Sequence, residues 1–467
     1  MTLTHDSSLI WFVLVYGMVM LMLGVWFSRQ IKDSDDFVLA GKSLGPMVLA
    51  GTLLATFVGS GSVTGGPNSI GYMHGFMPAI LISMPVGIIA LGILYMIAPK
   101  IRAFGKYTIS QVLEEKYGQG AKSLSALIII LAYVGIVSYQ FKGMAFVLNV
   151  ATGLPVGTGT MISAAIIIFL AVIGGMMAIA PTDALSAFLM IVGLLAAIPS
   201  VLIAGNGWSG IVSALPPENL TMTGSLSVLE IIGYMLPFVF LMLGDQNIYQ
   251  RLASSKGEKS SQSGLMIWFL GMLLLYPAIP FIAMVARSIF PDIAPGMALI
   301  SMTTVMPLFF GGIMLAAIVA VIVTTGNSYL LSASTSLTYD VYVRYFRPDA
   351  DSREILRVTK AAIPLLGMLA FVLLQFFPTI LKIQMTSYLV YGAGITPAVL
   401  GVFLWPRVNK YGGISSMVVG VVSTLGFYIP FGNAGAALAI PLAVMTLVLV
   451  TLLTSKPGCC NIQTEKV

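Results

Sequence analysis

The chain has 467 residues, of which 58% are hydrophobic and only 9% are charged, and its formal net charge is +6. A mean hydropathy of +0.98 excludes an ordinary soluble protein, because most of such a chain needs lipid as its solvent. In a membrane protein the positive charge reports on orientation rather than on nucleic-acid binding. We therefore predict a multi-pass protein of the cell membrane, with the lipid bilayer as a partner and no nucleic-acid partner.

Hydropathy predicts an all-α polytopic membrane protein with about thirteen transmembrane helices. Each apolar segment is near the length of roughly 20 residues that crosses a bilayer as a helix. In chain order the segments are 8–28, 45–72, 76–99, 122–151, 158–179, 182–204, 228–246, 262–287, 305–340, 356–378, 383–404, 412–430 and 434–454.

The basic residues predict the orientation of these spans. Loops on one side of the membrane hold all of the 23 Lys and Arg residues except Lys142, Arg287 and Lys382. The positive-inside rule then places the N-terminus outside and the C-terminus in the cytoplasm. The first apolar run has no basic segment before it, so we expect a retained helix rather than a signal peptide. The two cysteines, Cys459 and Cys460, fall in the cytoplasmic tail, where we expect reduced thiols, with lipidation as the alternative.

Few ionisable residues fall inside the predicted spans, and none of them forms a catalytic motif. Lys142, Asp183 and Asp245 are the main ones, and both histidines lie toward the outer side. A paired-His metal site or a Ser/His/Asp triad cannot be assembled from them, so we do not expect an enzyme. Ionisable groups within a membrane are costly, which makes the three residues functional candidates.

The segment "ATFVGSGSVTGG", residues 55–66, places weak helix formers in the middle of a predicted span. A nucleotide loop is disfavoured because no Gly-Lys-Ser/Thr follows. A packing face would need small residues on one side of the helix only, whereas here they surround it. The pattern therefore favours local unwinding, which frees carbonyls and hydroxyls to coordinate an ion or a solute.

A second polar concentration, "VTTGNSYLLSASTSLTYD", covers residues 323–340. Thr324, Thr325, Asn327 and Ser328 offer the hard oxygen ligands that Na⁺ prefers. The alternative is that each hydroxyl bonds the carbonyl four residues earlier in its own helix. Beside an unwound helix we favour coordination.

Three motifs carry a resemblance to a known family. They are Gly174-Gly175 ahead of Thr182-Asp183, the segment "DQNIYQR" from Asp245 to Arg251, and the polar helix followed by "YDVY". From about Asp36 to Pro406 the chain resembles the sodium:solute symporter family, and its choline, proline and pantothenate branches in particular. The resemblance implies a five-plus-five inverted-repeat fold with a broken first helix in each repeat. The implied units are a peripheral helix and loop (1–44), the first repeat (45–204), the second repeat (205–404), and two peripheral helices with the tail (405–467).

The resemblance also implies a primary Na⁺ site and leaves a second one open. The primary site takes carbonyls of Ala55, Val58 and Val321 and hydroxyls of Thr324 and Thr325. Some members bind a second Na⁺, and the matching positions here are Asp183, Thr324, Asn327 and Ser328. Asn327 departs from the hydroxyl that is usual there. The alternative role of Asp183 is an N-terminal helix cap, since "PTDA" is typical of a helix start.

The implied solute site lies beside the broken helix. Its expected residues are Phe57, Ser60, Ser62, Phe238, Leu241, Met242 and Leu389. This mostly apolar lining argues against a sugar, whose hydroxyls would need several buried polar partners. The aromatic cage expected for a choline site is incomplete, with Phe57 and Asp245 at two positions where that branch has Trp. An amino acid, a monocarboxylate and an amine all remain open.

Two charged residues keep alternative roles. Asp245 either attracts a cationic group of the solute or pairs with a basic residue at the cytoplasmic mouth, and we favour the mouth. Lys142 either binds a solute carboxylate or extends to the outer interface, and we favour the interface.

The resulting hypothesis is Na⁺-coupled, electrogenic uptake of a small organic solute by alternating access, with a monomer as the functional unit. The alternatives are a solute sensor, an uncoupled channel or an H⁺-coupled symporter. A sensor is disfavoured because the sequence ends about a dozen residues after the last predicted span, where sensors of this kind append a signalling domain. H⁺ coupling is disfavoured because the primary site has no carboxylate.

Overall fold

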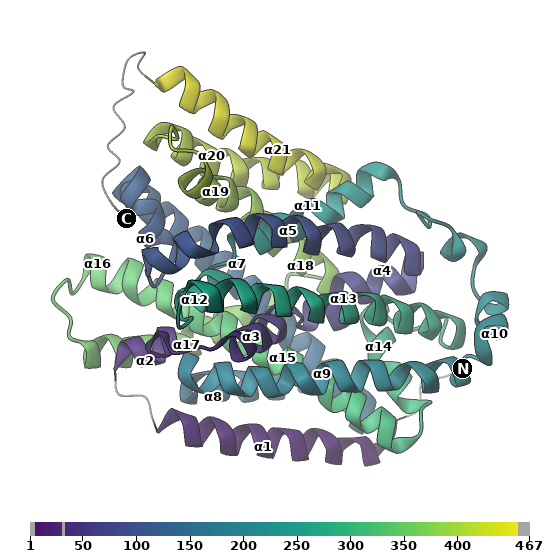
Figure 1. The fold of residues 1–467 in the computed structure, drawn as a ribbon. Helices are drawn as coiled ribbons and strands as arrows, with labels where there is room; N and C mark the ends of the chain where they lie inside the picture. The colour runs from purple at the N-terminus through teal and green to yellow at the C-terminus, as the bar shows by residue number, and fades with distance from the viewer. Residues whose placement is uncertain (1–4, 30–32, 456–467) are drawn as a thin grey trace.

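A computed structural model describes residues 5–29 and 33–455, and within these ranges the fold is all-helical with no strand. The tail cysteines Cys459 and Cys460 lie outside the described residues. The long helices run side by side along one direction (Figure 1). This arrangement satisfies the backbone of each membrane segment within its own helix, as lipid requires.

The helices follow the predicted spans closely. In the first half of the chain they are α1 (Ile10–Ser28), α2 (Ser34–Leu39), α3 (Pro46–Phe57), η3 (Gly61–Gly65), α4 (Gly66–His74), α5 (Phe76–Phe104), α6 (Ile109–Tyr117), α7 (Gln119–Thr152), α8 (Val156–Ile173), α9 (Met176–Ala204) and α10 (Gly207–Ala214). In the second half they are α11 (Val228–Gly244), α12 (Gln246–Ala253), α13 (Glu258–Ile289), α14 (Ala298–Ser301), α15 (Leu308–Ser336), α16 (Val343–Tyr345), α17 (Ser352–Leu374), α18 (Ile380–Gly394), α19 (Thr396–Leu404), α20 (Lys410–Ser423) and α21 (Ile429–Thr454). Short single-turn helices η1 (Ser7–Leu9), η2 (Ala40–Lys42), η4 (Pro217–Leu220), η5 (Pro295–Met297), η6 (Met302–Thr304), η7 (Leu337–Tyr342) and η8 (Thr424–Tyr428) complete the set.

The number of membrane-length segments agrees with the prediction of about thirteen. In the described residues, eleven helices are long and apolar enough to cross a membrane, and the bent pair α3 and α4 makes twelve. The stretch Lys410–Thr454 is one of these eleven helices, but Gly432 within it has non-helical backbone angles. Ser416 donates to the Ala443 carbonyl and Ser423 to the Ala439 carbonyl, so the two arms of the stretch pack as an antiparallel pair. Counted as two spans, they raise the total from twelve to thirteen.

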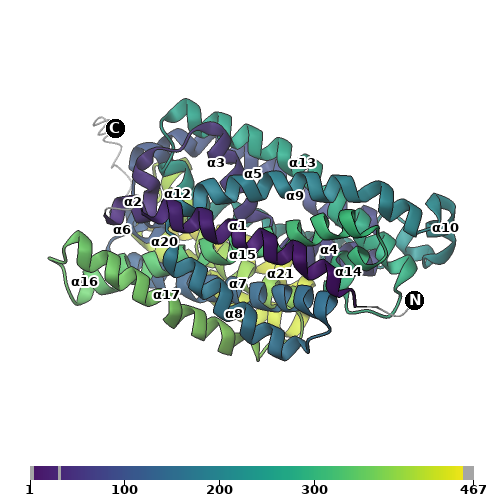
Figure 2. The same ribbon diagram turned by 90° about the horizontal axis from the view of Figure 1, so that it is seen from below.

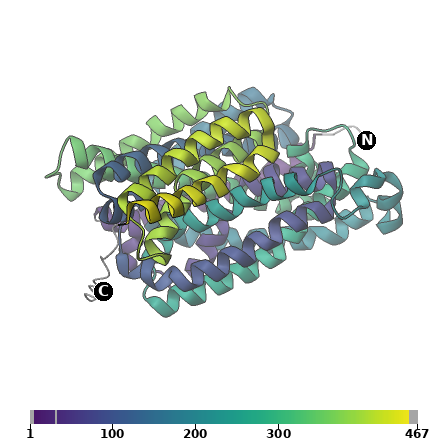
Figure 3. The same ribbon diagram turned by 90° about the horizontal axis from the view of Figure 1, so that it is seen from above.

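Burial separates an inner group of helices from a peripheral one. In α7, α15 and the pair α18 and α19, 78% of the apolar window is buried inside the protein, against 22% for α1. The first helix lies at one side of the molecule and α20 and α21 lie at the opposite side (Figures 1 and 2). Viewed from above, α20 and α21, coloured yellow-green to yellow, lie over the middle of the bundle (Figure 3). The first span and the last two therefore lie on opposite sides of the bundle, and the division of the chain into repeats and peripheral segments stays a prediction.

The first broken helix is found where the sequence predicts it. Helix α3 ends at Phe57, Val58 has non-helical angles (φ −88°, ψ 84°), and a π-helical turn over η3 leads into α4. The two halves are bent by 47°. The small residues also serve close packing, since a methyl group added at Gly59 would lie 2.7 Å from the Thr325 Cβ. Unwinding and close approach thus occur in the same segment.

The second break separates α11 from α12 at Asp245. This residue has extended backbone angles (φ −63°, ψ 118°), and its carboxylate accepts a hydrogen bond from the Asn247 N–H, 2.8 Å away. An aspartate in this position caps the helix that follows. The break therefore arises from a helix stop and restart within one span.

The boundary between α8 and α9 differs from the prediction. The sequence placed the break near residues 180–181, but α8 ends at Ile173 and α9 begins at Met176, after Gly174 and Gly175. Gly175 has a φ of +89°, which favours glycine. Pro181 lies inside α9, where the neighbouring structure tolerates it.

Candidate ion and solute site

The end of α3 meets the middle of α15 through an oxygen-rich contact. The Thr324 and Thr325 hydroxyls each lie 3.0 Å from the Ala55 carbonyl oxygen. Thr325 also lies 3.1 Å from the carbonyl of Thr56, and Thr324 lies 3.3 Å from that of Val321. Four of the five residues predicted for the primary Na⁺ site therefore meet at one point, and the fifth, Val58, is the first residue after the end of α3.

Oxygen acceptors outnumber hydroxyl hydrogens at this contact. The Thr324 hydroxyl also lies 2.9 Å from the Ala320 carbonyl, so the bond to its own helix, which was the alternative interpretation, is present as well. The two hydroxyl hydrogens face carbonyls of both α3 and α15. The carbonyls in the last turn of a helix, such as those at the end of α3, have no N–H donor within their own helix. No group of three or more His, Cys, Asp or Glu side chains lies together anywhere in the described ranges. A cation at this contact would meet neutral hydroxyl and carbonyl oxygens only.

Asp183 lies in the interior of α9, with its carboxylate beside the end of α3. Its carboxylate accepts hydrogen bonds from the hydroxyls of Thr52 (2.6 Å) and Thr56 (3.4 Å), both on α3. The alternative role of Asp183 as a helix cap is wrong, because α9 begins seven residues earlier, at Met176. Asp183 instead connects α9 to the broken helix.

The guanidinium of Arg251, on α12, occupies the space between Asp183 and Ser328. Its Nη2 lies 3.3 Å from the Asp183 carboxylate and 2.7 Å from the Ser328 hydroxyl, and its Nε donates to the Thr52 hydroxyl at 2.9 Å. The Arg251 side chain is completely buried. Asn327 Oδ1 has no hydrogen-bond partner among the described residues. Two of the four residues predicted for a second Na⁺ site are thus joined by a cation that the chain itself supplies.

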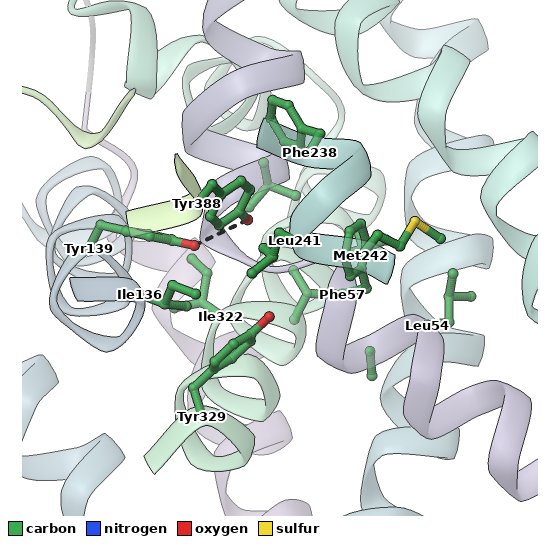
Figure 4. Close-up of a cluster of buried hydrophobic side chains, with 14 of the residues drawn as sticks. Leu54, Phe57, Ile136, Tyr139, Phe238, Leu241, Met242, Ile322, Tyr329 and Tyr388 are labelled. Atoms are coloured by element: carbon green, nitrogen blue, oxygen red, sulfur yellow. Dashed lines mark hydrogen bonds between the residues drawn. The ribbon is translucent and has the colours of Figure 1, made fainter. Parts of the chain in front are cut away.

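Four of the seven predicted solute residues gather in a cluster that includes Phe57. Figure 4 shows Phe57, Phe238, Leu241 and Met242 in one buried cluster with side chains of α7, α15 and α18. Phe57 packs edge-on against Trp268, with ring centroids 5.9 Å apart, and Phe238 packs edge-on against Tyr388, at 5.2 Å. The broken helix therefore contributes to both the oxygen-rich contact and the aromatic cluster.

The remaining predicted solute residues are buried but lie differently. Ser60 faces α7, since its N–H donates to the Gln140 Oε1 and its hydroxyl to the Tyr139 carbonyl. Ser62 lies in the π-helical turn and is 5% exposed, and Leu389 lies on α18 with no exposed surface. The structure thus assigns Ser60 to the contact with α7.

Polar residues that the sequence reasoning missed surround the same segment. Tyr139 and Tyr388 form a hydroxyl-to-hydroxyl hydrogen bond of 3.2 Å (Figure 4). Gln384 accepts from the Gly66 N–H at 2.8 Å through Oε1, which leaves its Nε2 without a partner in the described residues. Gln140 likewise accepts from Ser60 and has an unpartnered Nε2. The signal in the sequence was the spacing of Gln384 and Tyr388, which places both on one face of a helix.

Asp245 has partners that neither earlier interpretation included. It accepts hydrogen bonds from the hydroxyls of Tyr133 and Tyr329 and caps α12. The residue is fully buried and takes part in none of the ion pairs of the described chain. The preferred prediction, a pair with a basic residue at the mouth, is therefore wrong, because tyrosine hydroxyls satisfy the carboxylate.

Lys142 lies at the edge of a cavity of about 290 Å³. The cavity is bordered by Thr64 and Ser69 of the broken helix and by the turn at Pro295. The Lys142 ammonium donates to the Pro378 carbonyl at 3.1 Å. This half-buried position fits the interpretation that Lys142 extends to an interface rather than into the aromatic cluster.

Comparison of the sequence with known protein families identifies the family. The sodium:solute symporter family model matches residues 37–420. The chain belongs to the sodium:solute symporter family. Relatives include the sodium/pantothenate symporter of Escherichia coli, 28% identical with 88% of each chain covered. Another is the high-affinity choline transporter 1 of Caenorhabditis elegans, 25% identical over 88% of this chain and 76% of that one. These relatives are transporters, so the family indicates transport and no enzymatic activity.

A solved structure supports the fold. A Na⁺-coupled sialic acid symporter, in a substrate-bound outward-open state, superposes with a TM-score of 0.81 over 96% of this chain and 97% of that one, at 18% identity. The fold is therefore that of sodium symporters with two inverted five-helix repeats. The first helix of each repeat is the one broken here, at Val58 and at Asp245.

Proposed function

We propose that the protein imports a small carboxylate-bearing solute, an amino acid or a monocarboxylate, by symport with Na⁺ through alternating access. The observation that carries the proposal is the position of Phe57. One residue before it, Thr56 contributes a carbonyl to the contact with Thr325, while the Phe57 ring lies in the aromatic cluster. One backbone turn thus serves both ligands.

The proposed Na⁺ ligands are the five residues of the primary site. The carbonyls of Ala55, Val58 and Val321 and the hydroxyls of Thr324 and Thr325 offer neutral oxygens in a buried place. A cation there would relieve the surplus of acceptors and hold α3 against α15. Because the same turn positions Phe57, bound Na⁺ raises solute affinity, and bound solute raises Na⁺ affinity by the same factor.

The polar atoms beside the break support a carboxylate rather than a quaternary ammonium. Gln140 and Gln384 each use their oxygen to accept a backbone N–H, which fixes the orientation of the amide and leaves its NH₂ group without an acceptor. Buried donors without acceptors are costly. A solute carboxylate would satisfy them, whereas a choline-like head group brings no acceptor.

We propose the orientation of the chain in the membrane from the charge pattern, and the two inverted repeats from the two helix breaks. Helices α2, α6 and α16 lie at one end of the bundle, and α10 and α14 lie at the other (Figure 1). The sequence segments 29–42, 100–122 and 343–360, which include α2, α6 and α16, hold 13 of the 23 basic residues. We assign the first end to the cytoplasm. Segments 45–204 and 205–404 are the two repeats, and one chain provides the whole transport path.

The first test replaces Na⁺ by K⁺. Purified protein is screened by thermal unfolding with L-proline, pantothenate and choline, each in Na⁺ and in K⁺, and the stabilising solute is then used for uptake into proteoliposomes. We expect stabilisation by a carboxylate solute in Na⁺ only. With one Na⁺, uptake of a zwitterion such as L-proline moves one net charge, so an inside-negative potential adds about 2.3 kcal/mol per 100 mV to its driving force. Uptake of a monocarboxylate anion with one Na⁺ moves no net charge and should not respond to the potential. Equal uptake in K⁺ would overturn Na⁺ coupling and point to H⁺ coupling or a channel.

The second test concerns Gln384. The Gln384→Leu variant removes the unpartnered donor and the acceptor of the Gly66 N–H, so the KM for the solute should rise roughly tenfold or more, since a buried hydrogen bond to a charged group contributes about 1.5–3 kcal/mol. Activation by Na⁺ should persist. The control is Gln375→Leu, at an exposed position just after the end of α17. If both variants keep the wild-type KM, Gln384 does not contact the solute.

A further inference from the structure

The buried cluster around Asp183 contains a permanent positive charge. Arg251 and Asp183 are 0% and 1% exposed, and the guanidinium contacts the carboxylate, the Ser328 hydroxyl and the Thr52 hydroxyl. Its Nη1 lies 3.3 Å from the Asn247 carbonyl. These contacts join α12, which follows the second break, to α3, α9 and α15.

The ligand set around Arg251 is also the one that a small cation would use. Thr56 donates toward Asp183 and shares a hydrogen bond with Ser328, so hydroxyls and a carboxylate point at one place. Two further oxygens, Asp183 Oδ1 and Asn327 Oδ1, are buried and have no partner in the described residues. Buried acceptors of this kind are rare and require an explanation. Asp183 Oδ1 is thus coordination capacity that the guanidinium leaves unused, and Asn327 precedes Ser328, whose hydroxyl the guanidinium contacts.

We infer that Arg251 acts as a tethered cation at the Asp183 site and excludes a second Na⁺, so that the wild-type protein binds one Na⁺, at the primary site. A fixed guanidinium already neutralises the only carboxylate of the cluster. A Na⁺ placed within a few ångströms of it in a buried environment would be disfavoured on the order of a thousandfold, because like charges repel strongly at low dielectric. This inference rests on the proposed Na⁺ coupling and concerns its stoichiometry.

The geometry predicts what happens when the charge is removed. Without the guanidinium, the buried Asp183 carboxylate is left unpaired, which is costly. Na⁺ can then bind to Asp183, Asn327, Ser328 and Thr324. Neutralising one residue should thus add an ion site to the protein rather than remove one.

The experiment counts bound Na⁺ by equilibrium binding of ²²Na⁺ to the purified full-length protein in detergent, with K⁺ as the competing salt control. We expect one Na⁺ per chain in the wild type, two in Arg251→Gln, and one again in the double variant Asp183→Asn with Arg251→Gln. Arg251→Lys keeps a tethered charge and should bind one. Arg102→Gln, which removes a basic residue outside the cluster that donates to the Ser255 carbonyl, should also bind one.

Two Na⁺ in the wild type, or one in the folded Arg251→Gln variant, would overturn the inference. If Arg251→Gln elutes as aggregate, Arg251→Met provides a second neutral variant, and the wild-type count alone still tests the inference. No Na⁺ binding at all in the wild type would instead contradict the proposed function, so the two failures are distinguishable.

Discussion

The double variant Thr324→Ala with Thr325→Ala should lose Na⁺-dependent uptake. Both hydroxyls lie 3.0 Å from the Ala55 carbonyl and supply two of the five proposed ligands. Removing a ligand that interacts with a charge costs about 1.5–3 kcal/mol, and each 1.4 kcal/mol is a factor of ten. We expect the Na⁺ concentration for half-maximal uptake to rise at least roughly a hundredfold, as measured by uptake at a fixed solute concentration over a range of Na⁺.

A matched control separates ion binding from helix damage. Thr335 lies on the same helix, is equally buried, and donates only to the Leu331 carbonyl of its own helix. Thr335→Ala should therefore keep the wild-type Na⁺ dependence. An unchanged Na⁺ dependence in the double variant would show that the Na⁺ ligands lie elsewhere.

The break in the first repeat and the oxygen-rich contact beside it were predictable because their residue types are unusual in a membrane helix. Small and hydroxyl-bearing residues between Ala55 and Gly66 contradict a membrane helix in the sequence itself, and the structure has the break there, with α3 ending at Phe57. Thr324 and Thr325 stand out in an apolar helix for the same reason. Residues whose type conflicts with their surroundings can thus be recognised without knowledge of their partners.

The partners of Asp183 could not be predicted, because they come from long-range packing. Arg251 follows Asp183 by 68 positions, and its sequence neighbours suggest only a helix near an interface. Its burial depends on the stop at Asp245, which turns α12 toward α3. The start of α9 was misplaced for a related reason, since a proline inside a membrane helix resembles a helix start.

Gln140, Gln384 and the tyrosines were missed because polar residues on a buried helix face do not stand out by type alone. Tyr139 and Tyr388 belong to α7 and α18, which meet only in the folded protein. The hydropathy pattern predicts that both helices are buried, and it contains no information on which faces meet. The identity of the solute depends on those faces.

Substitution of Gly59 by alanine should weaken Na⁺ binding although every proposed ligand residue is retained. Gly59 follows the end of α3, and a methyl group there would collide with the Thr325 side chain, 2.7 Å from its Cβ and closer still to its hydroxyl. Real contacts of this kind are not seen that close, so the Thr325 hydroxyl must leave the Ala55 carbonyl. We expect Na⁺ affinity to fall at least roughly tenfold, by ²²Na⁺ binding to the purified protein.

Gly61→Ala provides the contrasting variant two residues away. Its methyl group would lie 2.7 Å from the Gln384 Nε2 and 2.9 Å from the Tyr388 hydroxyl, and Thr325 is not among its nearest neighbours. This variant should weaken solute binding and keep Na⁺ binding. Gly92→Ala, on α5, has no atom within 4 Å of the added methyl group and should change neither. If Gly59→Ala and Gly92→Ala bind Na⁺ equally well, the contact between α3 and α15 is not the ion site, and the break at Val58 serves the solute alone.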